Sequence, residues 1–193
     1  MGFRVCDRRY PFLWQTPGQQ AGRWNRSGDD PVHYLANTPT VAWAEWIRHQ
    51  EIEDQADLEG VAAALWAVLI PAHWGDRDLH VVEMPLELVL GTTPEAESAR
   101  LALVDQLKDQ GAQGLLAPTA ALHHSDTVMP LSMSAQVILL WCAAEQLPGW
   151  CGGRGCLSHE PAQAAQLLSG ESMALLMTMQ RPHSYAAADQ QTR

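Results

Sequence analysis

The sequence predicts a single domain in which β-strands and α-helices are mixed. With 193 residues, the chain is long enough to bury one core and short for two domains. Apolar residues make up 47% of the chain and eight residues are tryptophan, which is typical of a globular protein and not of a disordered one. Several short apolar runs of strand type flank two longer segments with helical spacing, and no internal repeat is present.

Two strands are expected near the N-terminus. Residues 3–10 predict the first strand, and the Pro-, Gly- and Gln-rich residues 11–22 predict a loop. A turn at residues 26–31 then leads into a short strand at residues 32–36.

A helix is expected directly after the second strand. Thr38 has the character of an N-cap, and Pro39 stands at the first position of a helix that runs to about Gln50. Helical spacing places Trp43, Trp46, Ile47 and Gln50 on one face, which we interpret as core. Glu45 lies beside that face, at the border between the core and a cleft.

The middle of the chain adds two strands. Residues 65–70 are β-rich and end at Pro71, and residues 79–84 form a second run of the same type. Residues 85–90 are expected to follow as an extension of that strand.

A second helix and two further strands complete the expected core, which covers residues 3–142. The helix covers about residues 94–110, with Thr93 as its cap and Gly111 as its stop. Residues 114–117 and 137–142 predict two buried strands. We treat 1–193 as one domain in which residues 143–193 form an extension of unassigned role.

The charge distribution limits the partners of the chain. A net charge of −10 argues against nonspecific nucleic-acid binding, which needs clustered Lys and Arg. Five of the twelve basic residues nevertheless lie in the first 26 positions: Arg4, Arg8, Arg9, Arg23 and Arg26. Ordinary surface charge and a positively lined cleft for an anionic ligand are both open explanations.

Targeting and membrane signals are absent from the pattern. The N-terminus has no apolar segment of signal-peptide length, and the longest apolar run, residues 61–72, is too short to cross a bilayer. We therefore expect a soluble cytoplasmic protein without a membrane partner, with its four cysteines reduced.

Residues 22–45 are the most informative stretch for function. A Gly22-Arg23-Trp24-Asn25 turn is followed by Tyr34 in a strand and by Glu45 in a helix. An anion-binding fork, an aromatic platform and a carboxylate are what a protein needs to hold a dinucleotide by its diphosphate, ring and ribose hydroxyls. Taken singly, the three residues are also compatible with a surface Arg, a half-buried strand aromatic and a solvated carboxylate.

This order of motifs resembles the RES-domain family, which is named for an Arg, a Glu and a Ser. The resemblance continues through residues 79–89, a strand entering a Pro-x-x-Leu turn, and through residues 106–120, a segment that ends in Pro-Ser-Ala in the family. Thr119 stands here where the family has Ser, so the hydroxyl is kept and a methyl group is added. The resemblance covers roughly residues 3–122.

The resemblance implies an α+β fold similar to ADP-ribosyltransferases, with a small, strongly bent mixed or antiparallel sheet flanked by helices and NAD in a cleft. Most members of the family are toxins of bacterial toxin–antitoxin pairs that consume NAD. It therefore implies cleavage of the nicotinamide–ribose bond with water or phosphate as acceptor, and a helix-turn-helix antitoxin as partner. NAD would be the substrate, and no cofactor or metal is expected.

The resemblance also assigns roles to individual residues. Glu45 and Arg23 are the expected catalytic residues. Glu45 would hydrogen-bond the ribose hydroxyls and stabilise the oxocarbenium-like charge, and Arg23 would bind the diphosphate. The other expected NAD-binding residues are Tyr34 facing the nicotinamide or its ribose, Thr119, and Arg4 as a second cation.

Two alternatives remain open at this point. The first keeps the site and transfers ADP-ribose to a protein target, as a mono-ADP-ribosyltransferase does. The second is an inactive RES-like protein that binds a partner and has lost activity through Thr119 and a divergent C-terminal third. The sequence does not decide the acceptor, the antitoxin, or whether copies of the chain form a homo-oligomer.

Two other clusters give weaker signals. Cys151, Cys156 and His159 have irregular spacing for a zinc site, and the glycines among them favour a flexible loop. His123, His124, Ser125 and Asp126 include the residue types of a hydrolase triad, but nothing there resembles a nucleophile elbow.

Overall fold

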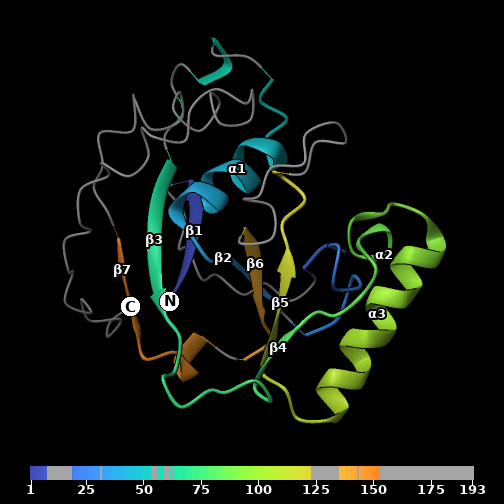
Figure 1. Ribbon diagram of the computed structural model, residues 1–193. Coiled ribbons are helices and arrows are strands. Elements are labelled where there is room, and N and C mark those ends of the chain that lie inside the picture. Colours follow the sequence, from blue (N-terminus) through green and yellow to red (C-terminus); the bar gives the residue numbers. More distant parts are fainter. Residues whose placement is uncertain are drawn as a thin grey trace.

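A seven-stranded mixed sheet forms the centre of the fold in the computed structural model (Figure 1). The structure describes residues 1–7, 19–30, 32–53, 56–58, 61, 63–122, 135–142 and 144–152. The hydrolase-like cluster at residues 123–126 and the cysteine and histidine at positions 156 and 159 lie outside these residues.

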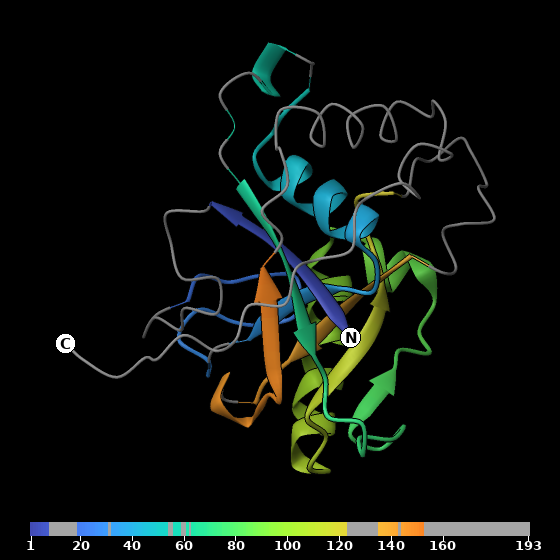
Figure 2. The same cartoon turned by 90° about the vertical axis from the view of Figure 1, so that its left-hand side faces the viewer.

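The strands follow the order β4-β5-β6-β2-β1-β3-β7 across the sheet. Only the β4–β5 pair is parallel, and the other neighbours are antiparallel. Figure 2 shows β1 and β3 crossing the direction of β5, so the sheet is strongly twisted. The expected α+β class with a bent mixed sheet is confirmed. The strands are β1 (Gly2–Asp7), β2 (His33–Ala36), β3 (Ala63–Leu69), β4 (Leu79–Val81), β5 (Gly114–Pro118), β6 (Gln136–Leu140) and β7 (Gly149–Gly152).

The two long helices begin where their caps predict. In α1 (Pro39–His49), the Thr38 hydroxyl accepts from the Val41 N–H at 3.2 Å. In α3 (Pro94–Asp109), the Thr93 hydroxyl accepts from the Ala96 N–H at 3.3 Å. Both caps satisfy a backbone donor that the first turn of a helix leaves free.

Two local predictions are wrong. Residues 85–90 do not extend β4, because Pro85 has no N–H for a strand ladder; its carbonyl instead accepts from the Leu88 N–H, at 2.9 Å, and the five-residue helix α2 (Leu86–Leu90) follows. The glycine-containing segment that begins at Cys151 is expected to be a loop, but its first residues, Cys151 and Gly152, belong to strand β7. Strand β7 pairs with β3, because backbone pairing overrides the low strand propensity of glycine.

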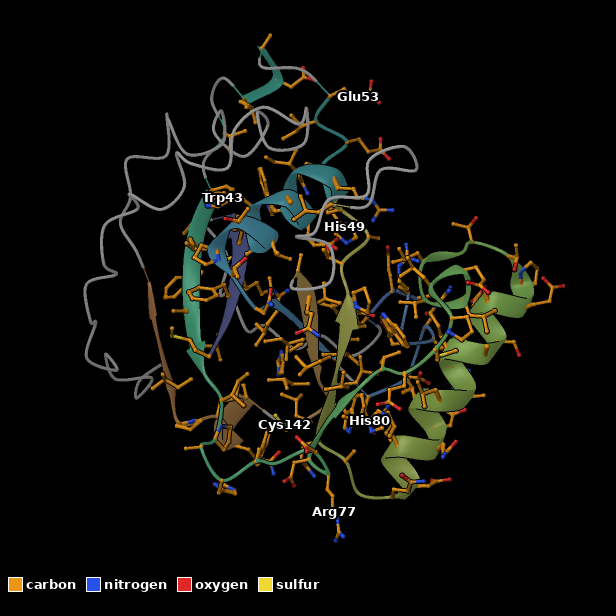
Figure 3. The ribbon with its side chains drawn as sticks, viewed as in Figure 1. Trp43, His49, Glu53, Arg77, His80 and Cys142 are labelled. Carbon is orange, nitrogen blue, oxygen red and sulfur yellow. The ribbon has the colours of Figure 1, made fainter. Side chains whose placement is uncertain are left out.

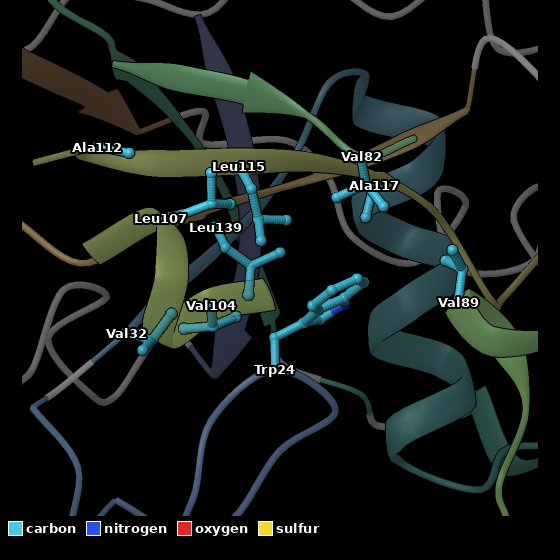
Figure 4. Close-up of a cluster of buried hydrophobic side chains, with 10 residues drawn as sticks. All are labelled: Trp24, Val32, Val82, Val89, Val104, Leu107, Ala112, Leu115, Ala117 and Leu139. Carbon is cyan, nitrogen blue, oxygen red and sulfur yellow. The ribbon is translucent and has the colours of Figure 1, made fainter. Parts of the chain in front are cut away.

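Helices cover two separate strips of one face of the sheet. Helix α1 packs over β1 and β3, and Trp43, fully buried, lies between α1 and β3 (Figure 3). Helices α2 and α3 pack over β5 and β6, where Trp24 joins Val104 and Leu139 in a second buried cluster (Figure 4). A third cluster, built around Leu35, fills the opposite face. The candidate site lies on the helix-covered face, between α1 and α2.

Candidate active site

The Gly-Arg-Trp-Asn motif is a closed turn that Tyr34 holds from the neighbouring strand. The Gly22 N–H donates to the Asn25 carbonyl at 3.0 Å. The Tyr34 hydroxyl accepts from the Trp24 N–H at 3.1 Å and donates to Asn25 Oδ1 at 2.8 Å. A Cβ at position 22 would lie 2.6 Å from Asn25 Oδ1 and 2.7 Å from Tyr34 Oη, so only glycine leaves room for this bond. The Tyr34 hydroxyl therefore fixes the turn that carries Arg23.

Half of the Arg23 guanidinium is already engaged by the protein. Its Nη1 donates to the carbonyls of Val89, at 3.2 Å, and Leu90, at 2.7 Å, at the C-terminal end of α2. These carbonyls lack partners within the helix and favour a cation. Nε and Nη2 of Arg23 have no hydrogen-bond partner among the described residues. This free edge has the geometry that binds phosphate or carboxylate oxygens.

A second arginine, Arg100 in α3, supports the same region from inside. Its side chain is buried and donates to the carbonyls of Leu88, at 2.6 Å, and Gly91, at 2.8 Å. Its Nε donates to the backbone carbonyl of Arg23 at 3.1 Å. Because Arg100 ties the turn, α2 and α3 together, it positions Arg23 through the backbone. The sequence reasoning missed Arg100, although its place in one helical stripe with Val104 and Leu107 marks it as a buried cation.

Glu45 is held on one oxygen only. Oε1 accepts a hydrogen bond from the Thr119 hydroxyl, and it also accepts from the N–H groups of Ala120, at 3.2 Å, and Ala121, at 3.4 Å. The Thr119 side chain is fully buried at the end of β5, so it reaches the site through Glu45 and has no exposed surface of its own. Oε2 has no partner within the part of the chain that the structure describes. The carboxylate is thus fixed in place with one free acceptor.

Electrostatics link these groups across the gap between α1 and the turn. Burial is the largest cause that lowers the pKa of Arg23, and the nearby charges of Arg100 and Arg48 lower it further. Glu45 and Tyr34 act in the opposite direction on that pKa. Arg23 and Glu45 do not form an ion pair with each other, so neither charge is neutralised by the other.

Of the residues expected at the site, the structure joins Tyr34 to the turn of Arg23 and Thr119 to Glu45, places Arg23 and Glu45 close enough for their charges to interact, and leaves Arg4 apart. In β1, Phe3 and Val5 pack under α1, so the alternation of a strand places Arg4 on the opposite face. Arg4 is paired there in register with Trp66, and burial lowers its pKa. The sequence reasoning also missed Arg48, which is exposed three residues after Glu45 in α1.

Comparison with known proteins identifies the family. Residues 3–144 match the family model for the RES domain, and the chain therefore belongs to the RES-domain family. The fold is similar to that in the crystal structure of the M.tuberculosis MbcT-MbcA toxin-antitoxin complex, with a TM-score of 0.53 and 18% identity. That match covers 87% of this chain and 88% of the other. No curated protein matches the chain.

Two further findings concern only the described ranges. No helix in them is both long and apolar enough to cross a membrane. They also contain no group of three or more His, Cys, Asp or Glu side chains that could hold a metal ion.

Proposed function

We propose that the chain is the toxin of a toxin–antitoxin pair and that it degrades NAD by cleaving the nicotinamide–ribose bond. The observation that carries this proposal is the arrangement of two half-engaged charged groups, the free Oε2 of Glu45 and the free edge of Arg23. Membership of the RES-domain family supports it. The similar fold of a protein from a toxin–antitoxin complex supports it as well.

The chemistry needs a fixed negative charge more than a strong base. When the bond between C1′ and the nicotinamide nitrogen breaks, its electron pair returns to the nitrogen and neutralises the pyridinium. The ribose is left as an oxocarbenium-like cation. Oε2 of Glu45 would accept hydrogen bonds from the ribose hydroxyls and stabilise that cation, and three donors already preorganise the carboxylate.

The acceptor completes the reaction. Water attacks C1′, loses a proton and gives ADP-ribose; inorganic phosphate gives the 1-phosphate ester instead. Arg23 would hold the diphosphate, with Tyr34 keeping its turn in place. In the cell, the chain would act in the cytoplasm, where NAD is available, and a helix-turn-helix antitoxin would block it.

The test is nicotinamide release from NAD by the purified chain, with and without phosphate. We expect release in both cases or only with phosphate, which separates a glycohydrolase from a phosphorylase. Release that requires an added protein acceptor would favour the mono-ADP-ribosyltransferase. Folded protein that leaves NAD intact under all three conditions would contradict the proposal and favour the inactive binding protein.

A cellular test addresses the toxin role separately. Expression of the chain should slow growth and lower cellular NAD, and a co-encoded helix-turn-helix protein should restore both. Normal growth and unchanged NAD at high levels of folded chain would contradict the toxin role.

A further inference from the structure

Arg48 is a cation beside the candidate site, and the reaction proposed above assigns it no role. It follows Glu45 by three residues in α1, so the two side chains are neighbours on the helix surface. Its own side chain is exposed, whereas Ala44 and Ile47 in the same helix are buried. Arg48 therefore lies next to Glu45 on the exposed surface of α1, within reach of a ligand that contacts the free oxygen of Glu45.

Nothing in the described part of the chain neutralises Arg48. Its guanidinium forms no ion pair there, whereas Arg26, also exposed, is paired with Asp105 at 2.8 Å. Arg48 lies in the last turn of α1, where the negative end of the helix dipole favours a cation. This attraction does not occupy the hydrogen-bond donors of the guanidinium, which can still bind a ligand.

Arg48 and Arg23 carry like charges that act on each other. Burial is the largest cause that lowers the pKa of Arg23, and the charges of Arg100 and Arg48 lower it further, so Arg48 is close enough to Arg23 for their charges to repel. Two unpaired guanidinium groups that repel each other across a site are stabilised when an anion lies between them.

Arg23 alone is a poor match for a diphosphate. One of its two terminal nitrogens is committed to Val89 and Leu90, so a single edge remains. That edge can bind the oxygens of one phosphate bidentately, and the second phosphate of NAD then lacks a cation.

We propose that Arg48 is the second phosphate-binding residue of this site, which holds the diphosphate of NAD together with Arg23. This inference rests on the proposed function, because it names NAD as the ligand. Arg48 contributes to binding of the remote part of the substrate, so it lowers KM and leaves kcat nearly unchanged.

The test is a series of substrates that lose phosphates one at a time: NAD, nicotinamide mononucleotide and nicotinamide riboside. For NAD, Arg48→Gln should raise KM about tenfold, the loss of one charge-assisted hydrogen-bonded contact. Arg48→Lys, which keeps the charge without the fork, should raise KM by about two- to threefold. The effect of Arg48→Gln should shrink for the mononucleotide and vanish for the riboside.

The matched control is Arg77→Gln, which removes the same charge from an exposed arginine at the end of the molecule away from α1 (Figure 3). It should leave KM unchanged for all three substrates. An equal rise in KM across the series for Arg48→Gln would overturn the inference, since it would indicate a structural effect on α1.

Calorimetry with ADP-ribose separates this inference from the proposed reaction. If the wild-type chain binds ADP-ribose but does not cleave NAD, the reaction is wrong, and an approximately tenfold weaker affinity of Arg48→Gln still supports the phosphate contact. Equal affinities of the two proteins overturn it. Absence of any ADP-ribose binding by the wild type overturns the phosphate contact, whereas nicotinamide release alone decides the reaction.

Discussion

Glu45 and Arg23 are held in opposite ways, and the difference defines what the site accepts. Glu45 lies on α1 and is fixed by three donors at the end of β5. Arg23 lies on a turn and is fixed by two acceptors at the end of α2. Each interaction engages one half of the charged group and leaves the other half free. One side of the site therefore offers an acceptor and the other offers donors, which suits a ligand with both hydroxyls and anionic oxygens.

The largest effect is expected from removing the charge on the acceptor side. In Glu45→Gln, the amide oxygen can still accept from Thr119, so the fold is kept while the negative charge is lost. Nicotinamide release should fall about a hundred- to thousandfold, as when a preorganised electrostatic group is removed from an active site. The rate is measured with NAD at saturation, and an unchanged thermal unfolding midpoint is the control. Wild-type turnover in this variant would show that Glu45 is not the catalytic carboxylate.

Loosening the same carboxylate without changing its charge should have a smaller effect. Thr119→Val keeps the buried shape but removes the hydroxyl that donates to Glu45, a loss of about 1–3 kcal/mol. If the bond is retained in the transition state, turnover should fall roughly ten- to hundredfold. Thr119→Ser keeps the hydroxyl and should remain active. A valine variant as active as the serine variant would mean that the backbone N–H groups of Ala120 and Ala121 hold Glu45 by themselves.

The donor side can be disturbed at Gly22. An added methyl would collide with Asn25 and with the Tyr34 hydroxyl, so Gly22→Ala must break their hydrogen bond or shift the turn that carries Arg23. We expect the free energy of unfolding to fall by about 1–3 kcal/mol and KM for NAD to rise. The matched control is Gly75→Ala, where an added Cβ meets no atom within 4 Å. Equal stability and KM in the two variants would contradict the role of Gly22.

The last effect is a pH dependence of the free energy of unfolding that the Tyr34 hydroxyl introduces. Burial raises the pKa of Tyr34 to about 12, whereas a tyrosine in the unfolded chain ionises near a pKa of about 10. Below about pH 10 both states keep the proton. Between about pH 10 and 12 only the unfolded state releases it, so the free energy of unfolding falls by up to about 1.4 kcal/mol per pH unit.

Tyr34→Phe is the comparison that isolates this contribution. The variant should be less stable at neutral pH, because the Trp24 N–H loses its acceptor, and its disadvantage should shrink as the pH rises from 9 to 12. Chemical denaturation of both proteins at several pH values measures the difference. Parallel curves over this range would show that Tyr34 ionises normally in the folded chain.

The sequence predicted the local features that depend on neighbouring residues. Both long helices begin at their Thr caps, and the turn, the strand and the helix that carry Arg23, Tyr34 and Glu45 were all located correctly. Helix α2 was missed because five residues are too few to show helical spacing. Because α2 is not predicted, the contact of Arg23 with the carbonyls at the end of that helix is not predicted either.

Contacts between distant segments could not be predicted in the same way. Alternation along β1 shows that Arg4 and Phe3 lie on opposite faces, but only the sheet order and the helix packing reveal which face carries the site. Likewise, Thr119 and Glu45 are 74 residues apart, and their hydrogen bond depends on how α1 meets the end of β5. The resemblance of Thr119 to the family serine indicated a polar role without indicating its partner.

The most direct test of the account is a crystal structure of the chain with a carbocyclic NAD analogue, whose nicotinamide bond does not break. We expect Oε2 of Glu45 to accept from the ribose hydroxyls while Thr119 still donates to Oε1. The free edge of Arg23 should bind diphosphate oxygens while its Nη1 stays on α2. An analogue bound elsewhere on the chain, or bound without contact to either free half, would contradict the account.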